Sequence, residues 1–303
     1  MWPDEKQQRL REAALEWLSV RTHDGLYPLT HEDIAEFWFE GERFRLMDPQ
    51  RGIRKPAVFS SALSIRTVWR PTGADRPYDD EVGAHGLMVY KWRGDDPDHA
   101  ENRALRAAMD ATAPLIWFWG VGPGLYQVVF PVYLVGEDRS RQEFTVATDG
   151  LQHLRPTERP LEEVLRRYFL SQTVQRLHQP VFRAMVMRAY ENTCAVCSLR
   201  HPVLLDAAHI VEDKHPEGIA AVTNGLALCK IHHAAYDAGI VGVRPDLVIE
   251  VRSDILEEVD GPLLEHGIKG LHGQRLRMVP RSRREQPSEA LLAMHYERFR
   301  ATA

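Results

Sequence analysis

The feature that most constrains this chain is the placement of its cysteines. Its 303 residues include only three, arranged as the pairs Cys194-x2-Cys197 and Cys229-x2-His232. Two short-spaced pairs separated by a loop are the arrangement that closes a tetrahedral metal site with three thiolates and one imidazole. The alternative is three buried cysteines with no common role. Because every cysteine takes part in the pattern, we expect a structural zinc site.

A second histidine directly follows His232. Neighbouring residues on an α-helix point about 100° apart, so His232 and His233 cannot easily serve one site. If residues 229–237 are helical, Cys229 and His232 share one side of the helix, whereas His233 and Asp237 share another. The sequence therefore predicts one helix that serves two sites.

Further polar residues lie upstream of this helix. The strand-like run VLLDAAHIV contains His209, and Asn224 follows before the helix begins. In residue type, order and spacing, residues 190–240 resemble the HNH endonucleases, and the flanking cysteine pairs agree with that resemblance. The ββα-metal fold of this family takes a histidine from a strand, an asparagine from a loop and metal ligands from a helix.

The resemblance implies a role for each residue of the second site. His209 is expected to be the general base that takes a proton from the attacking water. Asn224 is expected to hold the base and its loop in position. His233 and Asp237 are expected to bind one catalytic divalent cation, Mg²⁺ or Mn²⁺, at the scissile phosphate. The family leaves a 5′ phosphate and a 3′ hydroxyl.

The chain departs from the family pattern at one position. Many HNH proteins carry a metal-binding Asp or His directly before the base, where this chain has Ala208. Asp206, two residues further back on the same strand face, is the substitute that we predict as a metal ligand. Ideal strand geometry leaves Asp206 about 6–7 Å from the position that Ala208 occupies. The alternative is a carboxylate that caps a neighbouring loop.

The remaining sequence indicates an α+β protein. We expect a helix over residues 4–20, a short helix capped by Thr30 and Asp33, and a closing helix over 288–301. Short β-branched and aromatic runs predict strands between residues 56 and 150, with one helix at 98–111. The predicted domains are an N-terminal helical segment at 1–55 and a β-rich SRA/PUA-like domain at 56–150. A helical linker at 151–185 follows, and then a zinc-stapled nuclease domain with a C-terminal extension at 186–303.

The β-rich segment carries a second resemblance. Tyr78, the acids that follow it and an apolar run ending at Tyr90 are similar to the SRA domain, which flips a modified cytosine out of DNA. The resemblance implies that Tyr78 and Tyr90 sandwich the flipped base and that Asp80 or Glu81 reads its Watson–Crick edge. The alternative is that both tyrosines pack in the sheet and the acids line a turn. Trp117, Phe118 and Trp119 are expected in the core.

Composition narrows the setting of the protein. A net charge of −5 argues mildly against a protein that coats nucleic acid, and 44% hydrophobic residues are ordinary for a globular chain. No apolar run reaches the length of a membrane span, the N-terminus lacks a signal-peptide layout, and the few cysteines favour a reducing compartment. We expect a cytoplasmic protein with double-stranded DNA as its partner and no membrane contact.

These patterns lead to one functional hypothesis and two alternatives. The chain resembles modification-dependent (type IV) restriction endonucleases with an SRA-like domain fused to an HNH nuclease. It would hydrolyse DNA that carries 5-methyl- or 5-hydroxymethylcytosine. A single HNH unit cuts one strand, so a homodimer would be needed to cut both. The alternatives are an HNH nuclease that reads another mark or plain DNA sequence, and a catalytically silent zinc-stapled DNA-binding module.

Overall fold

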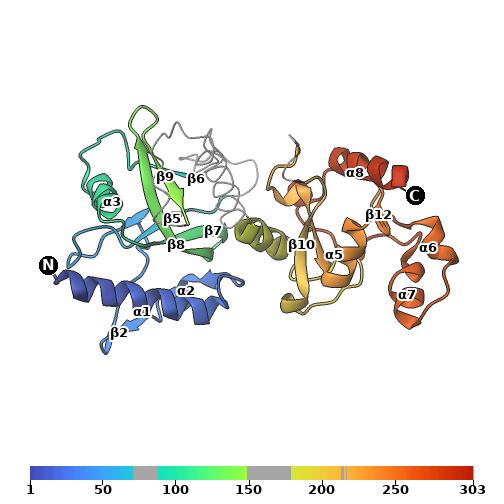
Figure 1. Cartoon of the computed structure of the whole chain (residues 1–303), viewed down its shortest axis with the longest axis horizontal. Coiled ribbons are helices and arrows are strands. Elements are labelled where there is room, and N and C mark those ends of the chain that lie inside the picture. Colours follow the sequence, from blue (N-terminus) through green and yellow to red (C-terminus); the bar gives the residue numbers. More distant parts are fainter. Residues whose placement is uncertain (71–87, 149–178, 213–214, 216, 303) are drawn as a thin grey trace, which may run out of the picture. The chain divides into compact units, whose positions relative to one another are not determined.

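The fold divides into two compact units, Met1–Val181 and Phe182–Ala303, which are described separately (Figure 1). No helix among the described residues combines the length and the apolar character needed to cross a membrane. The computed structural model describes residues 1–70, 88–148, 179–212, 215 and 217–302.

A mixed, curled sheet forms the centre of the first unit. Its longest strand, β8, has 14 residues and pairs along its length with β1, β7 and β9, so the sheet curls around it. β5 and β7 are parallel, and the other pairs are antiparallel. In the described part of this unit the sheet comprises β1 (Leu29–Thr30), β4 (Ile53–Arg54), β5 (Ser64–Thr67), β6 (Met88–Lys91), β7 (Leu115–Gly122), β8 (Leu125–Asp138) and β9 (Glu143–Ala147).

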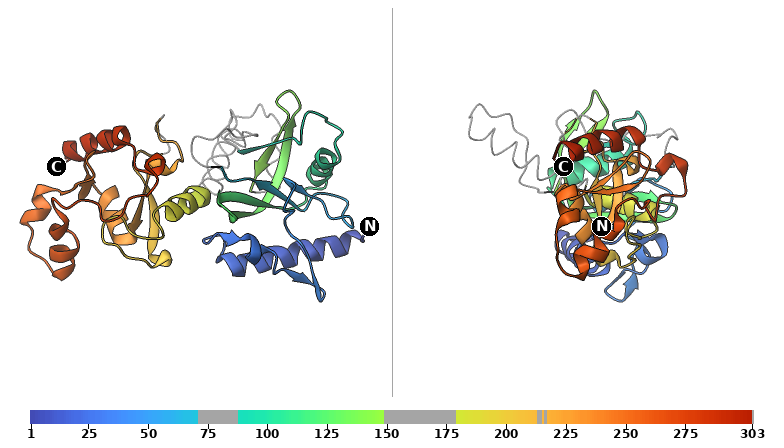
Figure 2. Two further views of the ribbon diagram at one scale, coloured as in Figure 1. Left: turned by 180° about the vertical axis from the view of Figure 1, so that it is seen from behind. Right: turned by 90° about the vertical axis from the view of Figure 1, so that its right-hand side faces the viewer.

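Helices and a small hairpin cover this sheet. The helix α1 runs along the sheet in Figure 1 and again in Figure 2, and Leu10, Ala14 and Leu18 pack in one core with Phe118 and Val128. This burial explains why the predicted N-terminal helix forms. The elements outside the sheet are α1 (Asp4–Thr22), α2 (His31–Ile34), the β2–β3 hairpin (Trp38–Phe39 and Glu42–Arg43) and α3 (Ala100–Asp110).

The predicted cap of the second helix is confirmed. Thr30 Oγ1 accepts a hydrogen bond from the backbone N–H of Asp33 at 3.1 Å, and the Asp33 carboxylate accepts from the Thr30 backbone at 3.0 Å. Hydrogen bonds from the Thr30 side chain and backbone lower the pKa of Asp33. The local chemistry of four residues was therefore enough to locate the start of α2.

The N-terminal segment shares its core with the sheet. β1 pairs with β8, and the predicted boundary at residue 55 falls between β4 and β5, which pair with each other. Val181 ends the first unit close to the predicted end of the linker at residue 185. Most of the predicted linker lies outside the described residues.

The second unit is built around a hairpin followed by a helix. β10 and β11 are antiparallel, with Leu205 opposite Cys229 and His209 opposite Gly225, and α5 follows β11 directly. A helix over residues 179–189 packs against the hairpin through Phe182 and Val186. The named elements are β10 (Leu205–His209), β11 (Gly225–Cys229), α5 (Lys230–Asp237), β12 (Val241–Val243), β13 (Ile249–Val251), α6 (Ser253–Glu257), α7 (Pro262–Gly267) and α8 (Glu289–Thr302), with 3-10 turns at Pro202–Leu204, Val222–Asn224, Lys269–Leu271 and Arg283–Glu285.

Gly225 sets the distance between this hairpin and the 179–189 helix. A Cβ at Gly225 would lie 2.5 Å from Val186 Cγ2 and 3.0 Å from Phe182 Cζ. We expect Gly225→Ala to lower the free energy of unfolding by about 1–3 kcal/mol, because buried atoms must move to admit the methyl group. Urea denaturation measures this. Gly261→Ala is the control, since nothing lies within 4 Å of its Cβ; a larger loss there would contradict the packing argument.

Candidate functional site

The helix α5 separates two groups of polar side chains. Cys229 is its N-cap, and His232, one turn later, is 5% exposed. His233 and Asp237 lie on another side, where their side chains are 23% and 63% exposed. The two consecutive histidines thus enter different clusters, as their angular separation on a helix requires.

The first cluster contains the three cysteines and His232. Their ligand atoms all lie within 4.8 Å of one another. Cys197 Sγ is 4.0 Å from Cys229 Sγ, and His232 Nδ1 is 3.1 Å from Cys229 Sγ and 3.7 Å from Cys194 Sγ. Zinc–sulfur bonds of 2.3 Å in a tetrahedron place two sulfurs about 3.8 Å apart. The cluster could therefore hold a zinc ion after a small adjustment of the side chains.

Surrounding contacts prepare these ligands for a metal. His232 Nε2 lies 2.8 Å from the carbonyl oxygen of Gly267, so its N–H donates there and Nδ1 faces the thiols. The backbone N–H of Cys229 donates to Cys194 Sγ at 3.2 Å. Hydrogen bonds from Cys194, Cys197 and then His232 lower the pKa of Cys229, whereas hydrogen bonds with Cys194 and Cys229 raise the pKa of Cys197, so Cys229 is the thiol that gives up its proton first.

His209 lies at the end of β10, beside the hairpin turn. Its ring stacks on Phe182, with 3.9 Å between centroids and 10° between planes. Phe182 can take this place because the residue opposite His209 is Gly225, whose missing side chain leaves room for the phenyl ring. The stack fixes the plane of the imidazole.

Asn224 closes the loop that follows His209. Its Oδ1 accepts from the Val211 backbone at 2.9 Å, and its Nδ2 donates to the carbonyls of Val211 at 2.9 Å and Ile219 at 3.0 Å. The residue is fully buried. These contacts hold the backbone at Val211, two residues after His209.

The second cluster contains His233 between two carboxylates. Asp237 Oδ2 lies 3.3 Å from His233 Nε2, and Asp206 Oδ2 lies 3.8 Å from Nδ1. Adjacent ligands of an octahedral ion with bonds near 2.1 Å are about 3.0 Å apart. His233 Nε2 and Asp237 could therefore bind one divalent ion with a small adjustment.

Asp206 reaches this cluster although ideal strand spacing left it distant from the base. It contacts His233 on the opposite side of the ring from Asp237, and Arg183 Nε lies 3.6 Å from its Oδ1. One imidazole cannot turn both nitrogens to the same ion. Asp206 thus lies beside His233 without a hydrogen bond to it, and its predicted role as a metal ligand stays a prediction. Its Oδ1 also accepts from the backbone of Ala207 at 2.9 Å.

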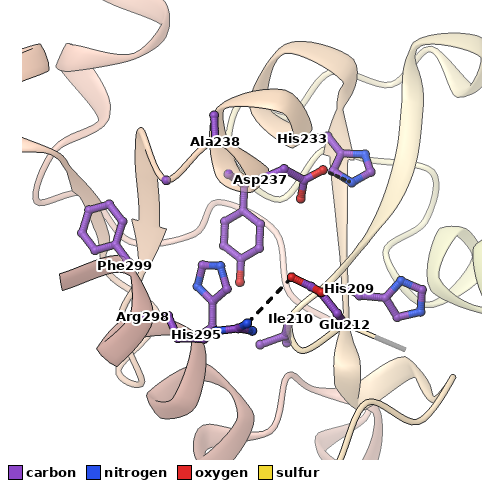
Figure 3. A pocket seen from close by; sticks show the side chains of 11 residues that line it. His209, Ile210, Glu212, His233, Asp237, Ala238, His295, Arg298 and Phe299 are labelled. Atoms are coloured by element: carbon purple, nitrogen blue, oxygen red, sulfur yellow. Dashed lines mark ion pairs between the residues drawn. The ribbon is translucent and has the colours of Figure 1, made fainter. Parts of the chain in front are cut away.

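An open cavity of about 520 Å³ joins His209, His233 and Asp237 (Figure 3). Its other wall carries residues that the sequence analysis missed, among them Glu212, Tyr236, His295 and Arg298. No local spacing links His295 or Arg298 to the HNH-like motif, because both come from α8 near the end of the chain. The remaining lining residues are Ile210, Ala238, Gly239 and Phe299.

Of the residues predicted to read a base, Tyr90 is the one that the structure describes. It is 5% exposed, its hydroxyl donates to the Gly52 carbonyl at 2.9 Å, and its ring meets Trp117 edge-on at 5.9 Å. Tyr90 therefore packs in the sheet, the alternative that the sequence left open. Trp117 and Phe118 are fully buried, which confirms their expected place in the core, whereas Trp119 is half-buried. Tyr78, Asp80 and Glu81 lie outside the described residues.

The family comparison matches the segment that carries both clusters. Residues 194–244 match the family model described as HNH endonuclease. This segment is an HNH endonuclease domain. The match includes all four cluster residues of the Cys3His site and both His233 and Asp237, whereas α8 lies beyond it.

Comparison with other known proteins gives distant likenesses to restriction endonucleases. No curated protein matches the sequence. One solved structure, "Modification dependent TagI restriction endonuclease", is 18% identical over 82% of this chain and 85% of its own, with a TM-score of 0.31. A second, the "Type IV phosphorothioation-dependent restriction endonuclease ScoMcrA", is 13% identical over 84% of this chain and 52% of its own, with a TM-score of 0.24.

Proposed function

We propose that the chain is a modification-dependent DNA endonuclease whose first unit reads 5-methyl- or 5-hydroxymethylcytosine and whose HNH domain hydrolyses the backbone. One observation carries the nuclease part. His209, His233 and Asp237 line a single open cavity on a ββα element, while a separate Cys3His cluster stabilises the same element. This arrangement provides a base, a pair of metal ligands and space for a phosphate.

In the proposed reaction, His209 takes a proton from the water that attacks phosphorus. The stack on Phe182 holds the plane of this imidazole, and the contacts of Asn224 hold the loop that follows it. A divalent cation bound by His233 and Asp237 would supply positive charge to the scissile phosphate and the leaving 3′ oxygen. Asp206 lies on the other side of the His233 ring and adds negative charge there.

The proposal for the first unit rests on the SRA-like sequence pattern around Tyr78. A flipped cytosine needs an aromatic platform, an acceptor for its amino group and an apolar notch for a 5-methyl group. Tyr78 would supply a stacking surface, worth about 1–3 kcal/mol per base. Asp80 or Glu81 would accept the amino proton. The proposed base flipping distinguishes this reader from one that recognises groove edges.

The test is digestion of matched plasmids that are unmodified or carry 5-methyl- or 5-hydroxymethylcytosine, each with Mg²⁺ or Mn²⁺. We expect cleavage of modified plasmids and little cleavage of unmodified ones. Comparing nicked with linear product over a range of protein concentrations tests the proposed homodimer. Equal cleavage of all three plasmids would favour an HNH nuclease that reads another mark or plain sequence. Binding without any cleavage would favour the silent DNA-binding module.

A pair of tyrosine variants tests the reader itself. Tyr78→Ala is expected to remove the preference for modified DNA, roughly 5- to 150-fold in affinity if one stack is lost. Tyr90→Phe should keep that preference, because Tyr90 packs in the sheet and its ring is retained. Fluorescence polarisation with modified and unmodified duplexes measures both. Unchanged preference in Tyr78→Ala would rule out its stacking role.

A further inference from the structure

The wall of the cavity opposite the HNH residues comes from α8 and from the buried side of α5. It is formed by Tyr236, His295 and Arg298, and Figure 3 shows His295 and Arg298 on the same side of the cavity. Both α8 residues lie outside the segment that matches the HNH family. The α8 part of this wall therefore lies beyond the matched segment, whereas Tyr236 lies within it.

Two polar atoms of this wall are buried without protein partners. Tyr236 is 2% exposed, and neither its hydroxyl nor His295 Nδ1 has a hydrogen-bond partner among the residues described. Buried polar groups in proteins almost always have a partner. Because both residues line an open cavity, these atoms mark a place where a bound molecule would complete the hydrogen bonds.

The stacking of the two rings limits what that molecule can be. Tyr236 and His295 lie face to face, with 4.1 Å between centroids and 9° between planes. Each ring therefore covers one face of the other, which leaves less of either ring free to stack on a base. A phenolic hydroxyl can donate to a phosphate or sugar oxygen. The wall is suited to a nucleic-acid backbone more than to a base.

Arg298 adds a positive charge to this wall. Its ion pair with Glu212 is 3.9 Å long, and the two side chains are 61% and 71% exposed, so the pair is weak. A guanidinium presents its donors in a fork that matches phosphate oxygens. Two contacts hold the helix that carries Arg298. The Tyr296 hydroxyl donates to Glu250 at 2.6 Å, and the Phe299 ring packs against Gly242, where an added Cβ would lie only 2.7 Å from the ring.

We propose that Arg298, with the Tyr236 hydroxyl and His295, forms a binding position for a DNA backbone phosphate next to the one that is cleaved. The proposal rests on the proposed function, because it uses the same cavity and the same substrate. Arg298 and the His209–His233–Asp237 group line one space of about 520 Å³. The α8 extension would thus hold the strand while the HNH residues act on its neighbouring phosphate.

The test measures the salt dependence of duplex binding in a His209→Ala background with Mg²⁺, where the DNA stays intact. Arg298→Ala is expected to lower affinity roughly tenfold and to reduce the slope of log K against log salt by about 0.9, the value for one phosphate contact. Arg298→Lys should keep the slope. Tyr236→Phe should weaken binding at an unchanged slope, because the hydroxyl carries no charge.

Arg300→Ala is the matched control, since this exposed arginine lies two residues further on α8 and points to another side of the helix. Equal slopes for Arg298→Ala and Arg300→Ala would overturn the proposal. The proposed function has its own readout, which is cleavage by the chain with His209 intact. If that chain cleaves and the slopes are equal, only the phosphate position fails. If it neither binds nor cleaves DNA, both fail.

Discussion

His209→Ala is expected to abolish DNA cleavage while leaving the fold and the zinc content intact. A positioned general base contributes about 10²- to 10⁴-fold to a reaction rate. The side chain lies at the end of β10 and stacks on Phe182, so its removal takes a ring contact from the core of this unit while the strand pairing of β10 is kept. Single-turnover nicking of a modified plasmid measures the rate, and thermal denaturation checks the fold.

His201→Ala provides the control for this experiment. His201 is an exposed histidine of the same unit, so its loss should change neither the rate nor the stability. Loss of a general base should leave about 1% of the rate or less. If His209→Ala keeps more than about 5% of the wild-type rate, the assignment of His209 as the base is wrong.

Cys194→Ser is expected to lose the zinc ion and most of the tertiary structure of the second unit. Cys194 is fully buried, and it accepts a hydrogen bond from Cys229 as well as facing His232. Structural zinc contributes about 10–16 kcal/mol of apparent binding free energy. That exceeds the net stability of many whole domains, about 5–15 kcal/mol. Elemental analysis and near-UV circular dichroism measure the two losses.

A neighbouring histidine makes the comparison specific. His233→Ala, one residue from the ligand His232, should keep its zinc and fold normally while losing cleavage, because His233 belongs to the other cluster. Zinc at one ion per chain in both variants would refute the two-site arrangement, since Cys194 would then not be a ligand.

The Cys3His cluster could be predicted from sequence because its spacing is local and its residue types are rare. Within each pair the two ligands are three residues apart, so local structure fixes the distance between them. The long-range requirement is that the end of β11 lies beside Cys194 and Cys197. The strand β11 itself was not predicted. All five of its residues are buried, so the run GLALC lacks the polar–apolar alternation that marks a half-exposed strand.

The far wall of the cavity could not be predicted, because it depends on tertiary packing. Arg298 lines the same cavity as the HNH residues because α8 packs closely on β12. This close packing is possible because Gly242 has no side chain to collide with the ring of Phe299. The curled sheet has the same origin. In the first unit, α1 and the capping box of α2 follow from local chemistry. The parallel pairing of β5 with β7 instead joins segments that are separated in sequence by β6 and α3.

The position of Asp206 shows a limit of ideal geometry. Strand spacing alone placed this carboxylate about 6–7 Å from the position of Ala208. In the structure, its Oδ2 lies 3.8 Å from His233 Nδ1 on α5. The relevant distance therefore runs between a strand and a helix, which sequence spacing does not determine.

The consecutive histidines of α5 also bear on how this segment can change in length. Cys229 and His232 must stay three residues apart for the zinc cluster, while His233 and Asp237 must stay four apart for the other cluster. One residue inserted between Cys229 and His232 would rotate the rest of the helix by about 100°. His232 would then turn away from the cysteines, and the His233–Asp237 pair would turn away from His209. A single insertion or deletion here would disable both sites at once, so the length of this short helix is as constrained as its residue types.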